Sequence, residues 1–485
     1  MLLSKLIEGL NAQKVNGTLE IDIDNIAYDS RKTRAGSLFV CIEGTIVDGH
    51  KYIADAIENG TKAFLVQKDV EVPEGITTIK VENTRYGLAF VADAFNDHPS
   101  TKFNLIGITG TKGKTTTSYM VKAILEAEQH KIGLVGTVAN LIGDEVLYAA
   151  RTTPESLDLQ NLFGDMVEKN VDSVVMEVSS QGLELHRVAQ CDFDIGVFTN
   201  FSRDHIGPKE HATLEDYFNA KAKLFKMCKK AITNIDSPEG RKIKAVATCD
   251  VLTYGLSEGA DVRAIDIDKQ TSHTTFKLVS PWGCDIITTN LQGEFNVYNA
   301  LAAISACCVL GISLDSVKKG LSNVSVPGRL ESVPVTGNYT VLIDYAHTPD
   351  SLKQVLTTAK DFAKGRVVSL FGCGGDRDRG KRPAMGEISG NLADFTIITS
   401  DNPRTEEPDR IIDDIEEGTK KTNGKYIKIT DRRQAIKYAL ETAQDEDVII
   451  LAGKGHETYQ QFADKTIHFD EREVVAELLS ELNEG

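Results

Sequence analysis

The sequence lacks any apolar run that approaches the length of a membrane-spanning helix. Its first residues, Met1–Glu8, form a short amphipathic stretch with an early acid, unlike a secretory signal peptide. Basic residues are fewer than acidic ones: the sequence contains 54 Lys and Arg and 71 Asp and Glu, which gives a net charge of −17. No basic run is dense enough to follow a nucleic-acid backbone. We therefore expect a cytoplasmic protein that binds neither membranes nor nucleic acid.

The sequence also lacks paired cysteines. Its eight cysteines are scattered, without the Cys-x-x-Cys sets of zinc sites or the spacing of a disulfide framework. Reduced, mostly buried thiols are the expected state, which again indicates the cytosol. There is no internal repeat and no low-complexity segment. With 485 residues, 41% of them hydrophobic, the chain is long enough for roughly two to four domains.

A glycine-rich stretch between a predicted strand and a predicted helix is the most informative motif. Residues 105–108 are an apolar run typical of a buried strand, and helical periodicity predicts a helix over residues 117–128. Between them, Gly110-x-x-Gly113-Lys114-Thr115 supplies glycines, a lysine and a hydroxyl, as in loops that bind phosphate and Mg²⁺. The spacing is shorter than the common G-x-x-x-x-G-K-[ST], and the alternative is a glycine-rich turn with a surface lysine. Because the chain is acidic, an anionic ligand needs such local donors.

Two breaks divide the alternating pattern of predicted strands and helices. They lie at Asn96–Ser100 and Val326–Arg329, which predicts domains at 1–98, 99–326 and 327–485. The alternation favours an α/β fold with mostly parallel sheets and helices on both faces. Strands are predicted at 37–42, 63–66, 77–81, 132–138, 171–178, 195–199, 231–234, 340–344, 366–371, 395–399, 426–429 and 448–452. Gly372-Cys373-Gly374-Gly375 lacks the order of a dinucleotide site, so an NAD-binding interpretation is weak.

Polar residues follow the predicted strands of the central region. Ligands of open α/β sheets bind beyond the carboxyl ends of the strands, so we expect these residues to converge on the phosphate loop. Glu177 and His205 could bind Mg²⁺ together with Thr115. The alternatives are a strand-end carboxylate in a salt bridge and a hydrogen-bonded loop histidine.

Five motifs occur in the order found in the Mur ligases, the ATP-dependent amide-forming enzymes of peptidoglycan precursor synthesis. They are Thr109-Gly110-Thr111-Lys112-Gly113-Lys114-Thr115-Thr116, Glu177-Val178-Ser179-Ser180, Asn200-Phe201-Ser202-Arg203-Asp204-His205, Gly293-Glu294-Phe295-Asn296-Val297-Tyr298-Asn299-Ala300 and Asp344-Tyr345-Ala346-His347-Thr348-Pro349-Asp350. The chain resembles this family over nearly its whole length, and within it the branch that joins a diamino acid to UDP-N-acetylmuramoyl-L-alanyl-D-glutamate. The resemblance implies an N-terminal uridine-nucleotide domain, a central P-loop ATPase-type domain and a C-terminal Rossmann-like domain for the amino acid.

Other functions stay open. An L-lysine-adding ligase of the same branch, another Mur ligase or a folylpolyglutamate synthetase would use the same chemistry. A nucleotide-dependent switch that hydrolyses ATP or GTP would explain the phosphate loop only. We expect a monomer.

The resemblance also implies roles for individual residues. Mg²⁺ and the reaction would involve Lys114, Thr115, Glu177, His205 and Lys221. ATP would contact Gly110, Thr111, Lys112, Gly113, Lys114, Thr115, Thr116, Asn296, Asn299, Asp344 and His347. The UDP-muramoyl dipeptide would contact Ser30, Thr45, Ile46, Val47, Thr152, Thr153, Ser179 and Arg187, whereas Leu185 stands where some relatives carry a glutamine.

The functional interpretation of Lys221 depends on the resemblance to the Mur ligase family. It resembles the lysine that CO₂ carbamylates to N6-carboxylysine, an anion able to bind Mg²⁺. Without the resemblance, a solvated helix lysine would be expected.

Asp401-Asn402-Pro403-Arg404 bears on the choice of amino acid. By resemblance, this motif marks enzymes that select meso-2,6-diaminopimelate, with Arg377, Gly453 and Glu457 completing the pocket. Diaminopimelate differs from lysine by one carboxylate, which a guanidinium can grip bidentately. The alternative is a loop arginine paired with Glu406 or Glu407.

Overall fold

The computed structural model describes residues 1–44, 47–204, 206–207, 210–270 and 273–484. It divides into two compact units. The first comprises Met1–Ile265, Leu278–Asp285 and Tyr298–Gly320, and the second comprises Asp266–Lys277, Ile286–Val297 and Leu321–Gly485. No helix in these described ranges is both long and apolar enough to cross a bilayer. All eight cysteines are free thiols, and six of them are buried.

The N-terminal part of the first unit holds a five-stranded sheet in the order β1-β5-β4-β3-β2. The strands are β1 (Ala12–Asn16), β2 (Asn25–Ala27), β3 (Ser37–Val40), β4 (Ala63–Val66) and β5 (Thr77–Val81), and the helices are α1 (Leu3–Leu6), α2 (Ile53–Glu58) and α3 (Thr84–Phe95). Side chains of β3 and β4 alternate between two apolar clusters, with Leu38 and Leu65 in one and Phe39 and Phe64 in the other. Both faces are therefore covered, and the near-continuous apolar runs follow from this.

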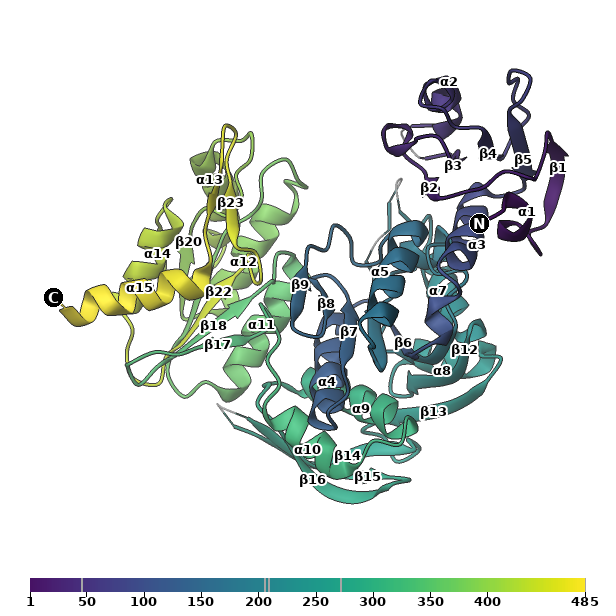
Figure 1. Ribbon diagram of the computed structural model, residues 1–485. Helices are drawn as coiled ribbons and strands as arrows, with labels where there is room; N and C mark the ends of the chain where they lie inside the picture. The colour runs from purple at the N-terminus through teal and green to yellow at the C-terminus, as the bar shows by residue number, and fades with distance from the viewer. Residues whose placement is uncertain (45–46, 205, 208–209, 271–272, 485) are drawn as a thin grey trace. The chain divides into compact units, whose positions relative to one another are not determined.

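An eleven-stranded sheet has the order β16-β15-β14-β13-β12-β11-β6-β10-β7-β8-β9, with β6 near its middle (Figure 1). Its strands are β6 (Asn104–Thr109), β7 (Ile132–Val135), β8 (Asn140–Ile142), β9 (Glu145–Leu147), β10 (Ser173–Glu177), β11 (Phe193–Phe198), β12 (Cys228–Asn234), β13 (Asp250–Gly255), β14 (Val262–Lys269), β15 (Thr274–Ser280) and β16 (Gly283–Thr289). The strands from β7 to β12 pair in parallel through β10, β6 and β11. The antiparallel edge strands β8 and β9 were not among the predicted strands.

Helices connect these strands. They are α4 (Lys114–Ala127), α5 (Ser156–Glu168), α6 (Ser180–Glu184), α7 (Leu214–Ala222), α8 (Pro238–Val246), α9 (Glu294–Val309) and α10 (Leu314–Ser322). Helix α4 begins three residues before the predicted start at residue 117, because Gly113 at φ 83° caps it and lets the helix start at Lys114. The first turn contains polar threonines, so a helix prediction based on the spacing of apolar residues did not detect it.

The C-terminal part of the second unit holds a six-stranded sheet in the order β17-β18-β22-β19-β20-β21. The strands are β17 (Glu331–Val333), β18 (Thr340–Asp344), β19 (Val367–Phe371), β20 (Phe395–Ile398), β21 (Tyr426–Lys428) and β22 (Val448–Ala452), followed by a hairpin of β23 (Tyr459–Gln461) and β24 (Thr466–His468). The helices are α11 (Pro349–Phe362), α12 (Lys381–Leu392), α13 (Pro408–Thr419), α14 (Arg432–Glu441) and α15 (Glu471–Glu484). Apolar clusters cover both sheet faces, so four of the five predicted strands of this region were readable as buried runs, whereas the edge strand β21 is only partly buried.

Candidate active site

The phosphate loop joins β6 to α4 and is held in shape by the end of β11. Gly110 has φ 150°, and a Cβ there would lie 1.9 Å from Thr199 Oγ1. The Lys112 N–H donates to Asn200 Oδ1 at 2.9 Å, and Asn200 Nδ2 donates back to the Lys112 carbonyl at 2.9 Å. The loop therefore requires glycine at 110 for close packing, and Asn200 fixes its path.

Lys114 opens the 14-residue helix α4 and reaches back over the loop. Its Nζ donates to the carbonyls of Gly110 at 2.9 Å and Thr111 at 3.0 Å. A helix N-terminus and a lysine that share one loop form an anion site. Asn299 borders it, because a Cβ on Gly113 would lie 2.4 Å from Asn299 Oδ1, and Thr116 is buried behind it.

Glu177, at the end of β10, faces the loop. Its buried carboxylate accepts hydrogen bonds from Thr115 Oγ1 at 3.0 Å and from the Thr137 N–H and hydroxyl at 2.9 and 3.1 Å. Within the described residues Glu177 forms no salt bridge, so that alternative is wrong here. Hydroxyl and carboxylate oxygens are the donors that Mg²⁺ prefers. The described part of the chain contains no group of three His, Cys, Asp or Glu side chains that could hold a metal, and His205 lies outside the described residues.

Lys221, on α7, is 1% exposed, so the expectation of a solvated helix lysine is wrong. Its Nζ donates to the Gly110 carbonyl at 2.9 Å and lies 4.4 Å from the centre of the Tyr217 ring. Burial, together with the charge of Lys114, lowers the pKa of Lys221 well below its ordinary value. A neutral amine is the nucleophilic form of lysine.

Thr152, Thr153 and Ser179 lie beside Glu177. Thr153 Oγ1 donates to the Glu177 carbonyl at 2.8 Å and accepts from the Ser179 N–H at 3.0 Å. The Thr152 hydroxyl lies 3.0 Å from that of Thr137. The polar strand ends therefore converge on the phosphate loop, as predicted.

Three arginines surround a single buried carboxylate next to these residues. Glu155 forms ion pairs with Arg187 at 3.0 Å, with Arg85 at 3.3 Å and with Arg151. Arg187 also donates to the Thr153 carbonyl at 3.1 Å. Three guanidinium groups on one carboxylate leave local positive charge, which suits an anionic ligand of an acidic protein.

The remaining residues expected to contact the UDP end of the substrate are Ser30 and residues 45–47. Ser30 begins a short 3₁₀ helix, and its carbonyl accepts from Asn59 Nδ2 at 3.1 Å. Val47 is 49% exposed, whereas Thr45 and Ile46 lie outside the described residues. Leu185 follows α6 as its C-terminal cap.

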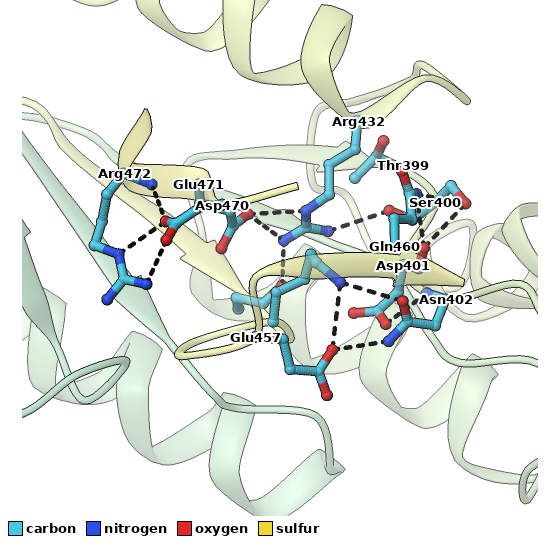
Figure 2. Close-up of polar contacts among 12 residues, drawn as sticks. Thr399, Ser400, Asp401, Asn402, Arg432, Glu457, Gln460, Asp470, Glu471 and Arg472 are labelled. Atoms are coloured by element: carbon cyan, nitrogen blue, oxygen red, sulfur yellow. Dashed lines mark hydrogen bonds and ion pairs between the residues drawn. The ribbon is translucent and has the colours of Figure 1, made fainter. Parts of the chain in front are cut away.

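In the second unit, two strand ends bring Asp401 beside Gly453 and Asn402 beside Glu457 (Figure 2). Asn402 Nδ2 donates to Glu457 Oε2 at 2.8 Å. The fully buried Lys454 donates to Asn402 Oδ1 at 3.2 Å and pairs with Glu457 at 3.3 Å. Gly453 has φ 115°, and a Cβ there would lie 2.6 Å from Asp401 Oδ2. This glycine therefore permits the close approach of the two loops.

Arg404 pairs with neither Glu406 nor Glu407, so that alternative is wrong. Its Nη1 donates to the Gly375 carbonyl at 2.8 Å, and among the described residues it forms no salt bridge. Glu406 is instead held at 2.8 Å by the fully buried Arg382. A Cβ on Gly374 would lie 2.8 Å from Arg404 Nη1 and 3.8 Å from Arg377 Cγ. The two predicted arginines thus flank one glycine, next to the buried Pro403.

Asp344 is the last residue of β18, and His347 lies three residues further along the chain. The Asp344 carboxylate accepts from the N–H groups of Leu330 at 2.9 Å and Ala346 at 2.8 Å. His347 Nδ1 lies 2.7 Å from the Tyr345 carbonyl. Asn296 donates to the Gln292 carbonyl at 2.8 Å in the first turn of α9.

Seven residues near the two sites were not predicted as site residues: Arg85, Thr137, Arg151, Glu155, Asn200, Tyr217 and Lys454. Asn200 belongs to one of the five ordered motifs, Tyr217 lies four residues before Lys221, and Lys454 lies between Gly453 and Glu457, so proximity in sequence was an available signal. No sequence signal pointed to Thr137, because its hydrogen bonds to Glu177 form only once β7 and β10 are paired.

Family models match three successive parts of the chain. They are described as "Mur ligase family, catalytic domain" over residues 22–96, "Mur ligase middle domain" over 108–307 and "Mur ligase, glutamate ligase domain" over 328–455. Two similar proteins are named UDP-N-acetylmuramoyl-L-alanyl-D-glutamate–2,6-diaminopimelate ligase. The one from Caldanaerobacter subterraneus subsp. tengcongensis is 50% identical over 99% of each chain. The one from Clostridium acetobutylicum, numbered 1, is 48% identical over 99% of this chain and 100% of its own.

Solved structures agree with these matches. One described by the same ligase name has a TM-score of 0.75 and 31% identity, and the match covers 100% of this chain and 99% of that one. A MurF ligase of Thermotoga maritima in complex with ADP has a TM-score of 0.62 at 19% identity, covering 95% and 98%, and shows the fold alone. The predicted family and the α/β fold of three Mur ligase domains are confirmed. This chain belongs to the Mur ligase family of ATP-dependent amide-forming enzymes.

Proposed function

We propose that the chain adds meso-2,6-diaminopimelate to the D-glutamate of UDP-N-acetylmuramoyl-L-alanyl-D-glutamate in peptidoglycan precursor synthesis. The observation that carries this proposal is 50% identity over 99% of both chains to a ligase of that name. Arg404 supports the choice of amino acid, because its guanidinium has no carboxylate partner among the described residues.

The reaction has two steps. The D-glutamate carboxylate attacks the γ-phosphorus of ATP and releases ADP, which gives an acyl phosphate. The amine of the amino acid then attacks the acyl carbon, an amide forms, and phosphate leaves. The first step joins two anions, so cations must reduce their repulsion. Lys114 would act at the phosphates, and the arginines around Glu155 would hold the anionic substrate.

The donor set fits Mg²⁺. Thr115 Oγ1 and the Glu177 carboxylate lie 3.0 Å apart, and hydroxyl and carboxylate oxygens are donors that suit Mg²⁺. Thr115, Glu177, His205 and a carbamylated Lys221 would hold the ion. When bound, Mg²⁺ would neutralise charge on the transferred phosphoryl group.

Carbamylation of Lys221 suits its position. The amine nitrogen would attack the carbon of CO₂, form an N–C bond and lose a proton to solvent. The product is an anion, and it would lie beside the loop where Lys114 supplies a positive charge. A buried amine would thus become a buried, anionic metal ligand.

The second unit would receive the amino acid. Arg404 and Arg377 would bind the far carboxylate of diaminopimelate, and Glu457 would accept its ammonium. Asp401, Asn402, Pro403 and Gly453 would form the wall between them, while Asp344 and His347 would contact ATP. We assign residues 1–98, 99–326 and 327–485 to the UDP-substrate, ATPase and amino-acid domains of a cytoplasmic monomer.

A phosphate-release assay with purified enzyme tests the proposal. Phosphate release should require ATP, Mg²⁺, the UDP-muramoyl dipeptide and diaminopimelate together. Preference for L-lysine would assign the chain to the lysine-adding activity of the same branch. Full nucleotide turnover without any acceptor would refute the ligase function and favour a nucleotide-dependent switch.

A further inference from the structure

A buried ion pair lies below the two loops of the amino-acid site. Arg432, the first residue of α14, and Glu471, the first residue of α15, are both 0% exposed in their side chains, and their ion-pair distance is 2.8 Å. Figure 2 shows the Arg432 side chain directed from its helix toward Ser400 and Glu471.

The remaining donors of Arg432 bind the backbone of both loops. Nη1 donates to the Ser400 carbonyl at 3.3 Å, and Nη2 donates to the Ala452 carbonyl at 2.9 Å. Ser400 immediately precedes Asp401, and Ala452 immediately precedes Gly453. The Arg432 guanidinium is therefore hydrogen-bonded to the residue that immediately precedes each of the two loops.

The sheet joins the two loops only indirectly, through β19, which pairs with both β20 and β22. The loop at residue 401 follows β20 and the loop at 453 follows β22, and β19 separates these strands in the sheet. No ladder of hydrogen bonds joins β20 directly to β22. The planar guanidinium of Arg432 binds the carboxyl ends of both strands. A lysine ammonium has a single nitrogen and cannot bind both ends with the same geometry.

Burial of this pair is costly for stability. Removing two charges from water costs several kcal/mol per ion, and an apolar replacement is often neutral or stabilising. Glu471 Oε2 is buried without a hydrogen-bond partner among the described residues, so the pair is not optimised for stability. A role in holding one arrangement of the loops accounts for its presence.

We propose that Arg432, held by Glu471, is a positioning residue that sets the distance between the Asp401–Arg404 and Gly453–Glu457 loops and thereby the affinity for the incoming amino acid. This inference rests on the proposed function, since it takes these loops as the amino-acid site. Displacement of one loop by about 1 Å would break the hydrogen bond between Asn402 and Glu457, which is 2.8 Å long.

The test compares Arg432→Lys and Glu471→Gln with the unmodified enzyme in steady-state kinetics. The KM for diaminopimelate should rise roughly tenfold or more, because misplacement by about 1 Å can cost a hundredfold. The KM values for ATP and the UDP-muramoyl dipeptide should stay unchanged. Arg366→Lys is the matched control, since Arg366 pairs with the buried Asp447 at 2.6 Å at the amino ends of β19 and β22.

A double variant, Arg432→Met with Glu471→Met, separates positioning from stability. It should melt near the unmodified enzyme's temperature and still show the raised KM for diaminopimelate. An unchanged KM for diaminopimelate in well-folded Arg432→Lys would overturn the proposal, as would a normal KM in the double variant. If the unmodified enzyme does not use diaminopimelate at all, the proposed function has failed instead. Should the double variant not fold, the single variants decide.

Discussion

Replacement of Arg404 is the sharpest test of amino-acid choice. Its Nη1 is occupied by the Gly375 carbonyl at 2.8 Å, which fixes the guanidinium and leaves its other donors for a ligand. A hydrogen bond to a charged group contributes about 1.5–3 kcal/mol, which corresponds to roughly ten- to a hundredfold in binding. We expect kcat/KM for diaminopimelate to fall by that range in Arg404→Ala. Arg404→Lys should lose about tenfold, because an ammonium cannot bind Gly375 and grip a carboxylate bidentately.

The backbone at Arg404 offers a control for stability. Its φ is 53°, a conformation that costs a non-glycine residue about 1–2 kcal/mol. Arg404→Gly relieves this strain, whereas the extra freedom of glycine in the unfolded chain costs about 0.5–1 kcal/mol. The two effects nearly cancel, so Arg404→Gly should melt at or slightly above the temperature of the unmodified enzyme while losing diaminopimelate use.

The assay is phosphate release at saturating ATP and UDP-muramoyl dipeptide, with diaminopimelate or lysine varied. Arg379→Ala is the matched control, because Arg379 is 65% exposed and pairs with Asp414 at 3.3 Å outside the proposed pocket. It should keep normal kinetics. The reasoning is refuted if Arg404→Ala uses diaminopimelate as well as the unmodified enzyme does, or if the unmodified enzyme uses lysine equally well.

Three further outcomes are expected. Lys114→Ala should nearly abolish phosphate release, since the charge at the loop is lost; near-normal turnover would exclude Lys114 from the phosphate site. Lys221→Ala should be inactive and partly rescued by added short carboxylic acids, which could fill the vacated site as Mg²⁺ ligands; wild-type rates without additive would contradict carbamylation. Burial lowers the pKa of His456 from 6.5 to about 4, so only the unfolded chain takes up this proton between these values. Stability should therefore fall as pH drops from 6.5 toward 4 and be unaffected by this group above 6.5. His456→Gln should flatten that decline in calorimetric melting curves, and an equal decline would contradict the assignment.

Several features were readable from the sequence because they depend on local pattern. The glycines and lysine of the phosphate loop stand between an apolar run and a helical one, and that order alone indicates an anion site. Strands buried on both faces, such as Thr340–Asp344 and Val448–Ala452, are continuous apolar runs and were predicted with their observed bounds. Ordered motifs then identified the family.

Tertiary structure decided which partners these residues have. Lys221 looked like a solvated lysine, yet it is buried and bonded to Gly110, 111 residues away. Arg404 stands close to two glutamates in the sequence, but Glu406 binds Arg382 of α12, so the Arg404 guanidinium is left for a ligand. Arg85 and Glu155 are separated by 70 residues and meet in one cluster. The periodicity of a sequence indicates which face of a helix or strand is buried. Which side chains a residue contacts depends on the distant elements that pack against that face. Only the folded chain determines which elements those are.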